Sequence, residues 1–144
     1  MMVDDLPKFQ EVEKPIRSFV SKRVIGVKSD TSVQKAAKRM VEFNVSSLTV
    51  IEDDEIIGIV TNDDLKKRVI AEGLSSQVPV KDIMTTDLIT ADIEVTVGEA
   101  LEIMAKKNIK HLPVKEDGEI AGILTFRDLI DIQKQKVETH ISRE

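Results

Sequence analysis

The stretch Gly-Ile-Val-Thr-Asn-Asp-Asp-Leu at residues 58–65 recurs as Gly-Ile-Leu-Thr-Phe-Arg-Asp-Leu at residues 122–129. In each copy an apolar run leads through a threonine toward a helix-like segment, and an aspartate follows the threonine by three positions. At this offset of 64 residues, 17 of the 51 pairs between residues 15–65 and 79–129 are identical without a gap. A fixed internal period of this kind predicts an architecture of two repeats.

The repeat predicts two domains, at residues 15–73 and 79–135, each with the order strand, helix, strand, strand, helix. We expect the first strands at residues 24–27 and 88–91. A β-α-β crossover places the first two strands of a repeat side by side and parallel, and the hairpin adds an antiparallel third strand. The predicted fold class is therefore α+β, with α/β-like crossovers.

The helices are predicted from their caps and their apolar spacing. Capping-box patterns occur at Thr31-Ser32-Val33-Gln34 and Thr96-Val97-Gly98-Glu99. Behind them, apolar residues at helical spacing form the stripes Val33, Ala36, Ala37, Met40, Val41 and Val97, Ala100, Leu101, Met104, Ala105. Asn44 and Asn108 stand where left-handed C-terminal caps are expected.

The strands are predicted from shorter patterns. Leu48 and Val50 alternate with polar residues, as do Leu112 and Val114, which indicates half-buried strands. Residues 56–60 and 120–124 are continuously apolar and are expected to be covered on both faces. Asp117-Gly118 favours a hairpin turn. Final helices are expected at residues 62–72, before Gly73, and from residue 126 to about residue 139.

The composition limits the possible functions. The net charge of −5 and four aromatic residues, all Phe, argue against nucleic-acid binding. The absence of Cys excludes disulfides and thiolate metal sites and suits a reducing compartment. No signal-like or 18-residue apolar run occurs, so we expect a cytoplasmic protein without a membrane partner. No spacing supports a catalytic triad, phosphate loop or metal site, so we expect no enzyme and no catalytic cofactor.

With this period and both Gly-apolar-apolar-Thr-x-x-Asp-Leu endings in register, residues 15 to about 135 resemble a tandem pair of CBS domains, often called a Bateman module. The resemblance implies two repeats that pack sheet to sheet around a pseudo-two-fold axis. It also implies two clefts between them, which in many members bind adenosine-containing ligands such as AMP, ADP, ATP or S-adenosylmethionine.

The endings Thr61/Asp64 and Thr125/Asp128 allow two interpretations. Each Thr can cap a helix while the Asp completes a capping box. The family resemblance implies that the Asp also accepts hydrogen bonds from both ribose hydroxyls, with the Thr hydroxyl facing the ligand. A carboxylate has two oxygens to match a cis-diol, and its charge strengthens the bonds. The two roles can coexist.

Basic residues surround only the second ending. Lys110 and His111 match positions where some family members place cations against phosphates, although they could equally be solvated residues at a strand edge. Arg127 is a further basic candidate. The matched residues of the first repeat are Ser46, Ser47 and Asp63. The two clefts are therefore expected to differ.

The resemblance also assigns the adenine pocket to Val20/Met84 and Ile25/Ile89. One cleft would combine Asp128 and Thr125 with Val20 and Ile25. The other would combine Asp64 and Thr61 with Met84 and Ile89. Apolar residues of this kind are also ordinary core residues, and the sequence alone does not separate the two roles.

Two functions are compatible with these patterns. The first is a regulatory module that senses adenine nucleotides or S-adenosylmethionine and signals to an effector protein of unknown identity. The alternative is a ligand-free module for interaction or dimerisation, which the negative net charge favours. A homodimer is expected in either case. The residues expected to form it are apolar ones on the two final helices: Leu65, Val69, Leu129, Ile130 and Ile132.

Overall fold

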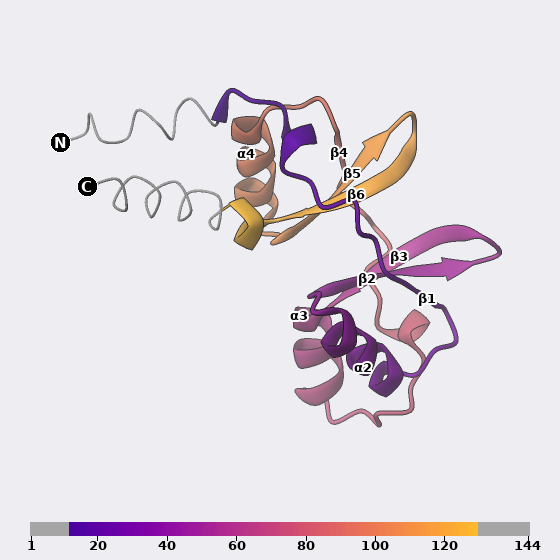
Figure 1. The fold of residues 1–144 in the computed structure, drawn as a ribbon. Coiled ribbons are helices and arrows are strands. Elements are labelled where there is room, and N and C mark those ends of the chain that lie inside the picture. Colours follow the sequence, from indigo (N-terminus) through magenta and orange to yellow (C-terminus); the bar gives the residue numbers. More distant parts are fainter. Residues whose placement is uncertain (1–11, 130–144) are drawn as a thin grey trace, which may run out of the picture. The chain divides into compact units, whose positions relative to one another are not determined.

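The structure is a computed structural model that describes residues 12–129. The chain divides into two compact units. We call Val24–Leu88 the inner unit, and Met1–Arg23 together with Ile89–Glu144 the outer unit, after their places in the sequence. Each unit contains one three-stranded mixed sheet with helices beside it (Figure 1). The predicted α+β class and the strand order within each repeat are confirmed.

The sheet of the inner unit has the order β1-β2-β3. Strand β1 (Gly26–Lys28) runs parallel to β2 (Ser47–Glu52), and β3 (Glu55–Thr61) returns antiparallel to β2. The first strand thus begins later than predicted. Asp53 and Asp54 form the β2–β3 turn with φ of 51° and 64°, the left-handed conformation that matches the twist of a hairpin.

Helix α2 (Val33–Phe43), helix α3 (Asn62–Asp64) and the π-helix Leu65–Ile70 lie on one side of this sheet (Figure 1). The predicted capping box at Thr31 is wrong, because Ser32 is the N-cap and its hydroxyl accepts a bond from the Lys35 amide. Asn44 ends α2 with φ of 53°, as predicted.

The burial of α2 follows the predicted stripe only in part. Val33, Ala36 and Met40 are buried in the inner core, whereas the side chain of Val41 is 82% exposed. The prediction for Val41 is therefore wrong. The final helix was expected at residues 62–72; it begins as α3, continues as the π-helix and ends at Ile70.

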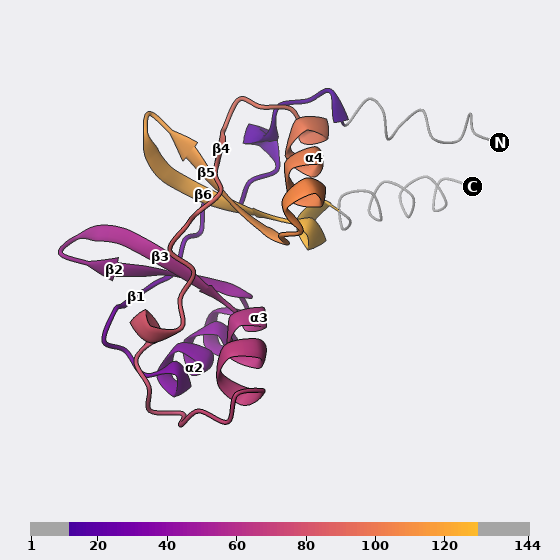
Figure 2. The ribbon, with the colours of Figure 1, turned by 180° about the vertical axis from the view of Figure 1, so that it is seen from behind.

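The opening segment of the second repeat, residues 79–88, is part of the inner unit. Its 3₁₀-helix Val80–Asp82 contributes Val80 to the inner core, and Ile83 follows it there. Thr85 then forms an isolated β-bridge to Ile59 of β3. Figure 2, which views the molecule from behind, shows this extended segment passing along β3. The opening residues of the second repeat thus complete the unit that holds the first repeat's strands.

The outer unit has the sheet order β4-β5-β6. Strand β4 (Ala91–Asp92) is parallel to β5 (His111–Glu116), and β6 (Glu119–Thr125) is antiparallel to β5. The strand predicted at residues 88–91 therefore starts later, as its counterpart does. Residues 126–129 begin the final helix, and its continuation to residue 139 lies outside the described residues.

Helix α4 (Val97–Lys107) confirms its predicted caps. The Thr96 hydroxyl accepts a bond from the Glu99 amide at 3.1 Å, and the Glu99 carboxylate accepts one from the Thr96 amide at 3.2 Å. Asn108 ends the helix with φ of 53°. Asp117 and Gly118 adopt the predicted hairpin turn. Ala105 is exposed, so its place in the predicted apolar stripe is wrong.

The N-terminal region completes the outer unit in the same way. Ile16 of the 3₁₀-helix Ile16–Ser18 is fully buried in the outer core, together with Val20. The Arg17 guanidinium pairs with Glu94 at 2.6 Å and with Glu116 at 2.7 Å, and these hydrogen bonds raise the pKa of Arg17. The opening segment of each repeat is therefore built into the compact unit that holds the strands of the other repeat.

The strands are buried differently from the prediction. Strand β2 is buried at Ser47 and Thr49 as well as at Leu48 and Val50, so it does not alternate between core and solvent. Strand β3 is buried only from Gly58 onward, and the start of its apolar run is partly exposed. Strand β6 repeats this pattern. Continuous apolar character therefore overestimated how much of each third strand is covered.

The residues expected to form a dimer contact lie mostly in the cores. Val69 and Leu129 are buried and therefore not available for a partner, and Leu65 is partly buried against the inner core. Ile130 and Ile132 lie outside the described residues. The large apolar side chains that are exposed between residues 12 and 129 are Val41, Ile70, Leu74 and Phe126. Among the same residues, no helix is long and apolar enough to cross a membrane.

Candidate functional site

The first ending stands where β3 passes into α3. Thr61 is the N-cap, and Asp64 is the third helical residue. The Thr61 amide and hydroxyl donate to Oδ2 of Asp64 at 2.9 and 3.2 Å, while the Asp64 amide donates to the Thr61 hydroxyl at 3.2 Å. This is a complete capping box. One oxygen of the Asp64 carboxylate is therefore occupied by the helix cap.

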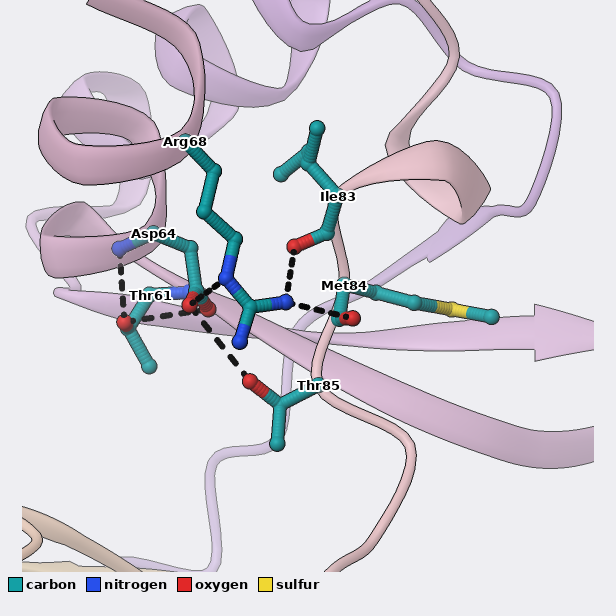
Figure 3. A network of polar contacts seen from close by, with 6 residues as sticks. All are labelled: Thr61, Asp64, Arg68, Ile83, Met84 and Thr85. Carbon is teal, nitrogen blue, oxygen red and sulfur yellow. Dashed lines mark hydrogen bonds and ion pairs between the residues drawn. The ribbon is translucent and has the colours of Figure 1, made fainter. Parts of the chain in front are cut away.

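The other carboxylate oxygen of Asp64 faces a second set of partners (Figure 3). Arg68 Nε lies 3.7 Å from Oδ1, and the Thr85 hydroxyl donates to the same atom at 3.4 Å. The Arg68 guanidinium also donates to the backbone carbonyls of Ile83 and Met84, at 3.1 Å each. Arg68 thus ties the first repeat's final helix to the opening segment of the second repeat.

This network surrounds a carboxylate that is almost completely buried. Asp64 is only 9% exposed, and a buried carboxylate needs charged or hydrogen-bonding partners. Arg68 is about half exposed, so its ion pair is partly screened by water. The network therefore satisfies Asp64 within the chain and leaves its guanidinium partner accessible from solvent.

Met84 lies beside β3, the strand that leads to the first ending. A side chain added at Gly58 would meet the Thr85 carbonyl oxygen at 2.8 Å and Met84 Sδ at 2.9 Å. The glycine of the repeated motif thus permits the opening segment of the second repeat to approach β3 closely. Thr61, Asp64 and Met84 therefore belong to one neighbourhood of the inner unit.

At the second ending the chain again passes from a strand through a threonine into a helix, but fewer hydrogen bonds form. The Thr125 hydroxyl accepts a bond from the Asp128 amide at 3.0 Å. The Asp128 carboxylate accepts no hydrogen bond and forms no ion pair with any residue between 12 and 129. Asp128 is partly buried. Within residues 12–129 the Asp128 carboxylate is therefore not engaged, whereas that of Asp64 is in use.

The N-terminal region supplies the second ending with its neighbours. A side chain at Gly122 would collide with the Ser21 carbonyl oxygen and the Val20 side chain, as Gly58 would with the matched residues. Ser21 also forms an isolated bridge to Ile123. Val20 thus lies beside the strand that leads to Thr125, and it is at the same time a core residue of the outer unit.

The basic candidates gather at the second ending. The Phe126 amide donates to the Lys110 carbonyl oxygen at 3.0 Å, and His111 pairs with Thr125 across β5 and β6. Lys110 and Arg127 are exposed and His111 is partly buried. The start of β5 and the start of the final helix therefore meet at one edge of the outer unit.

The predicted pairings of Ile25 and Ile89 are not tested. Ile25 packs against the inner core and Ile89 against the outer core. Each is thus in a different compact unit from the aspartate with which it was paired. The pairings of Ile25 with Asp128 and of Ile89 with Asp64 stay predictions.

The predicted site residues did not include Arg68 and Thr85. Arg68 follows Asp64 by four positions, a spacing at which opposite charges meet on a helix. Its matched residue in the second repeat is Ile132, and that of Thr85 is Ser21. A comparison of charges across the repeat could therefore have found the difference between the two endings.

A sequence model of a known protein family matches both repeats of the chain. The model of the CBS domain matches residues 16–71 and again residues 80–134. This chain belongs to the CBS domain family. It contains a CBS domain pair, with one match for each sequence repeat.

Relatives of the pair occur alone and within longer proteins. The chain is 34% identical over 134 residues to the inosine-5′-monophosphate dehydrogenase of Thermoplasma acidophilum, covering 89% of this chain but only 26% of that enzyme. A structure of an uncharacterized conserved protein from Pyrococcus horikoshii is 44% identical with a TM-score of 0.82, covering 85% of this chain and 93% of that one.

One related structure was solved with ligands. It is the CBS domain pair of protein MJ0100 in complex with 5′-methylthioadenosine and S-adenosyl-L-methionine. It is 28% identical to this chain with a TM-score of 0.75, and the match covers 85% of this chain and 98% of that one.

Between residues 12 and 129 of the present chain, no group of three or more His, Cys, Asp or Glu side chains could hold a metal ion.

Proposed function

We propose that this CBS domain pair is a regulatory module that binds an adenosine-containing ligand, and that the second ending is its principal site. In this proposal Asp128 accepts hydrogen bonds from the ribose hydroxyls, and Thr125 faces the ligand. The complex of the MJ0100 pair with two adenosyl compounds supports this ligand class. The module itself performs no catalysis.

We choose the second ending as the principal site because the carboxylates of Asp64 and Asp128 have different contacts. Asp64 is held by Thr61 and Arg68, so a ribose there must displace bonds that already exist. The Asp128 carboxylate is not engaged by any residue between 12 and 129. A ligand at the second ending therefore gains charge-assisted hydrogen bonds without first breaking an ion pair.

The charges around the second ending favour a ligand with phosphates. Lys110, His111 and Arg127 stand near Asp128, and both Lys110 and Arg127 are exposed. They can offset the negative charge of the nucleotide at a site on a chain whose net charge is −5. AMP, ADP and ATP fit this arrangement, while S-adenosylmethionine would use the ribose contacts alone.

We further propose that the pair acts as a homodimer and passes its ligand state to an effector protein. In the dehydrogenase relative the matching region is about a quarter of the enzyme, which is consistent with a pair that serves a larger partner. The residues that join two copies must differ from Val69 and Leu129, since these are buried.

The test is calorimetric titration of the ligand-free protein with adenosine, AMP, ADP, ATP, 5′-methylthioadenosine and S-adenosylmethionine. Asp128→Asn and Asp64→Asn form a matched pair. We expect Asp128→Asn to lower the affinity at least about tenfold, because losing a hydrogen bond to a charged group costs about 1.5–3 kcal/mol. Asp128→Asn should also reduce the discrimination between ribose and 2′-deoxyribose ligands.

Asp64→Asn should leave the affinity at the principal site within about twofold, a change of about 0.4 kcal/mol. Loss of binding in Asp64→Asn alone would transfer the site to the first ending. If none of the six compounds binds at millimolar concentration, the ligand-free interaction module is the correct function.

A further inference from the structure

A shallow groove lies between β1 and α2 of the inner unit, and most of the charged side chains that line it are basic. They are Lys28 of β1 and Lys35, Lys38, Arg39 and Glu42 of α2. All five are exposed. We call these five residues the basic groove. Such a concentration of positive charge is unexpected on a chain whose net charge is −5.

The fold does not require positive charge at these positions. The outer unit builds the matching strand and helix as β4 and α4, and there Asp92, Glu99 and Glu102 occupy the positions of the three lysines. Among residues 12–129, none of the three lysines of the basic groove forms an ion pair. Because neither the helix nor an ion pair with a described residue accounts for the lysines, their charge is available to a partner.

Arg39 is held in place within the basic groove. Its Nε donates to the Gly26 carbonyl oxygen at 3.0 Å, and its guanidinium lies 5.0 Å from the centre of the Phe43 ring. A guanidinium over an aromatic ring makes a favourable cation–π contact. A side chain that is already fixed loses less conformational entropy when a partner binds. Arg39 therefore gives the groove a positive charge at a defined position.

The spacing of the basic groove suits an extended peptide. Lys35 and Arg39 are four residues apart, which is about 6 Å along the axis of α2. Alternate residues of an extended chain point to the same side and recur at about 6.6 Å. Strand β1 is an edge strand of its sheet, and edge strands are common docking places for extended peptides. Acidic residues at alternate positions of such a peptide would therefore match the basic residues in register.

Glu42 argues against an occupant that is negative along its whole length. It lies about 10 Å from Lys35 along the axis of α2, at one end of the basic groove. A polyphosphate or a nucleic-acid strand would bring negative charge to that end too, whereas a peptide can place a Lys or Arg there. The chain also contains no Trp or Tyr, so it offers few rings on which bases could stack.

The basic groove is separate from the exposed apolar side chain of α2. With about 3.6 residues per turn, the α2 residues of the groove lie on one flank of the buried stripe, and Val41 lies on the other flank. Val41 is 82% exposed. A partner in the groove therefore leaves the Val41 flank of α2 uncovered.

We propose that the basic groove is the docking site for an extended acidic segment of a partner protein. The segment carries acidic residues at alternate positions and a basic residue that faces Glu42. The inference rests on the proposed function, because it gives a chemical character to the effector protein of that proposal. Charge complementarity sets orientation and association rate more than total affinity, so we expect a contact that weakens as salt screens the charges.

The test uses two fluorescein-labelled synthetic peptides, Asp-Ser-Glu-Ser-Glu-Ser-Asp-Ser-Lys and the same peptide with Glu as its last residue. Fluorescence anisotropy measures their binding to the full chain at about 0.05 M and about 0.5 M salt. We expect the peptide that ends in Lys to bind at least about threefold more tightly, because its last residue faces Glu42. Glu42→Lys should reverse this order, and high salt should weaken both complexes.

A pair of charge variants tests the location of the site. Lys35→Glu combined with Lys38→Glu introduces the acidic residues that α4 carries at the matched positions, so α2 should keep its fold. The control is Lys106→Glu with Lys107→Glu, which changes the net charge equally at exposed positions of α4. We expect the groove variant to lose at least about tenfold in peptide affinity, and the control to stay within about twofold of the wild type.

Several outcomes would overturn the docking site. Equal losses of affinity in the two double variants would mean that only the net charge of the chain attracts the peptides. Inorganic polyphosphate or single-stranded RNA that binds more tightly than either peptide, and is lost in the groove variant, would make the groove a polyanion site. Circular dichroism and sedimentation velocity accompany each titration, and a groove variant that loses its helix content or changes its association state as it loses the peptide would also refute the site.

Titration of the same proteins with ATP separates this inference from the proposed function. A wild-type chain that binds ATP but neither peptide at about 1 mM overturns the docking site and leaves the nucleotide site intact. A chain that binds the peptides in the groove but no nucleotide supports the docking site and refutes the nucleotide-sensing role. The groove variant should bind ATP as the wild type does, because its substitutions lie on α2 and away from both endings.

Discussion

Removing the two matched aspartates one at a time should reveal how differently they are used. In Asp64→Ala the helix loses a capping interaction worth about 1 kcal/mol, an ion pair of a half-exposed Arg68 worth about 0.5 kcal/mol, and the Thr85 hydrogen bond, worth about 0.5 kcal/mol. The sum is about 2 kcal/mol. Both aspartates also sit in a first helical turn, where a negative charge contributes about 0.5 kcal/mol.

Asp128→Ala should cost only that last contribution, because between residues 12 and 129 its carboxylate has no other partner. At about 3 °C per kcal/mol for a chain of this length, Asp64→Ala should lower the melting temperature about 6 °C more than Asp128→Ala. The assay is differential scanning calorimetry of ligand-free protein, because a bound nucleotide would itself stabilise the fold.

Arg68→Met serves as the control, since it removes the ion pair and the bonds to the Ile83 and Met84 carbonyls while leaving the cap of Asp64 in place. A double-mutant cycle between Asp64 and Arg68 should give a coupling of about 0.5 kcal/mol. Equal losses of stability in Asp64→Ala and Asp128→Ala would refute the asymmetry on which the choice of site depends.

Three further outcomes follow from single features. Lys110→Ala combined with His111→Ala should weaken ATP binding about tenfold more than adenosine binding and reduce its salt dependence; calorimetric titration would show equal losses if these residues do not contact phosphate. Gly122→Ala should lower the free energy of unfolding by about 2 kcal/mol in urea, because the new methyl group meets the Ser21 backbone. Asn108→Ala should cost about 1 kcal/mol and Asn108→Gly almost nothing, since the residue has φ of 53°.

Much of the fold could be predicted because local chemistry determines it. Asn44 and Asn108 tolerate the left-handed conformation that ends a helix, and both do so. The Thr96–Glu99 capping box forms as its spacing predicts. The box predicted at Thr31 failed, although the 64-residue register already places Ser32, the actual cap, opposite Thr96.

The errors come from properties that depend on the assembled unit. Periodicity cannot tell that Val41 lies at the margin of the covered stripe, because the width of the buried face depends on the neighbouring elements. It also cannot show that Val69 is needed in the core and is therefore not left for a partner. At the site, the pattern identified Asp64 and Asp128 equally, and the contacts of the Asp64 carboxylate with Thr61, Arg68 and Thr85 distinguish the two.

The two endings lie near the points where the chain passes from one compact unit to the other. The chain passes from the outer to the inner unit after Arg23 and returns after Leu88. Ser21 and Thr85, which bridge to β6 and β3 beside the two endings, stand within a few residues of these crossings. A ligand that displaces either bridging segment therefore acts on a short covalent connection to the other unit. Because Arg68 holds one of these segments through the Ile83 and Met84 carbonyls, it is the side chain through which a change at Asp64 would reach that connection.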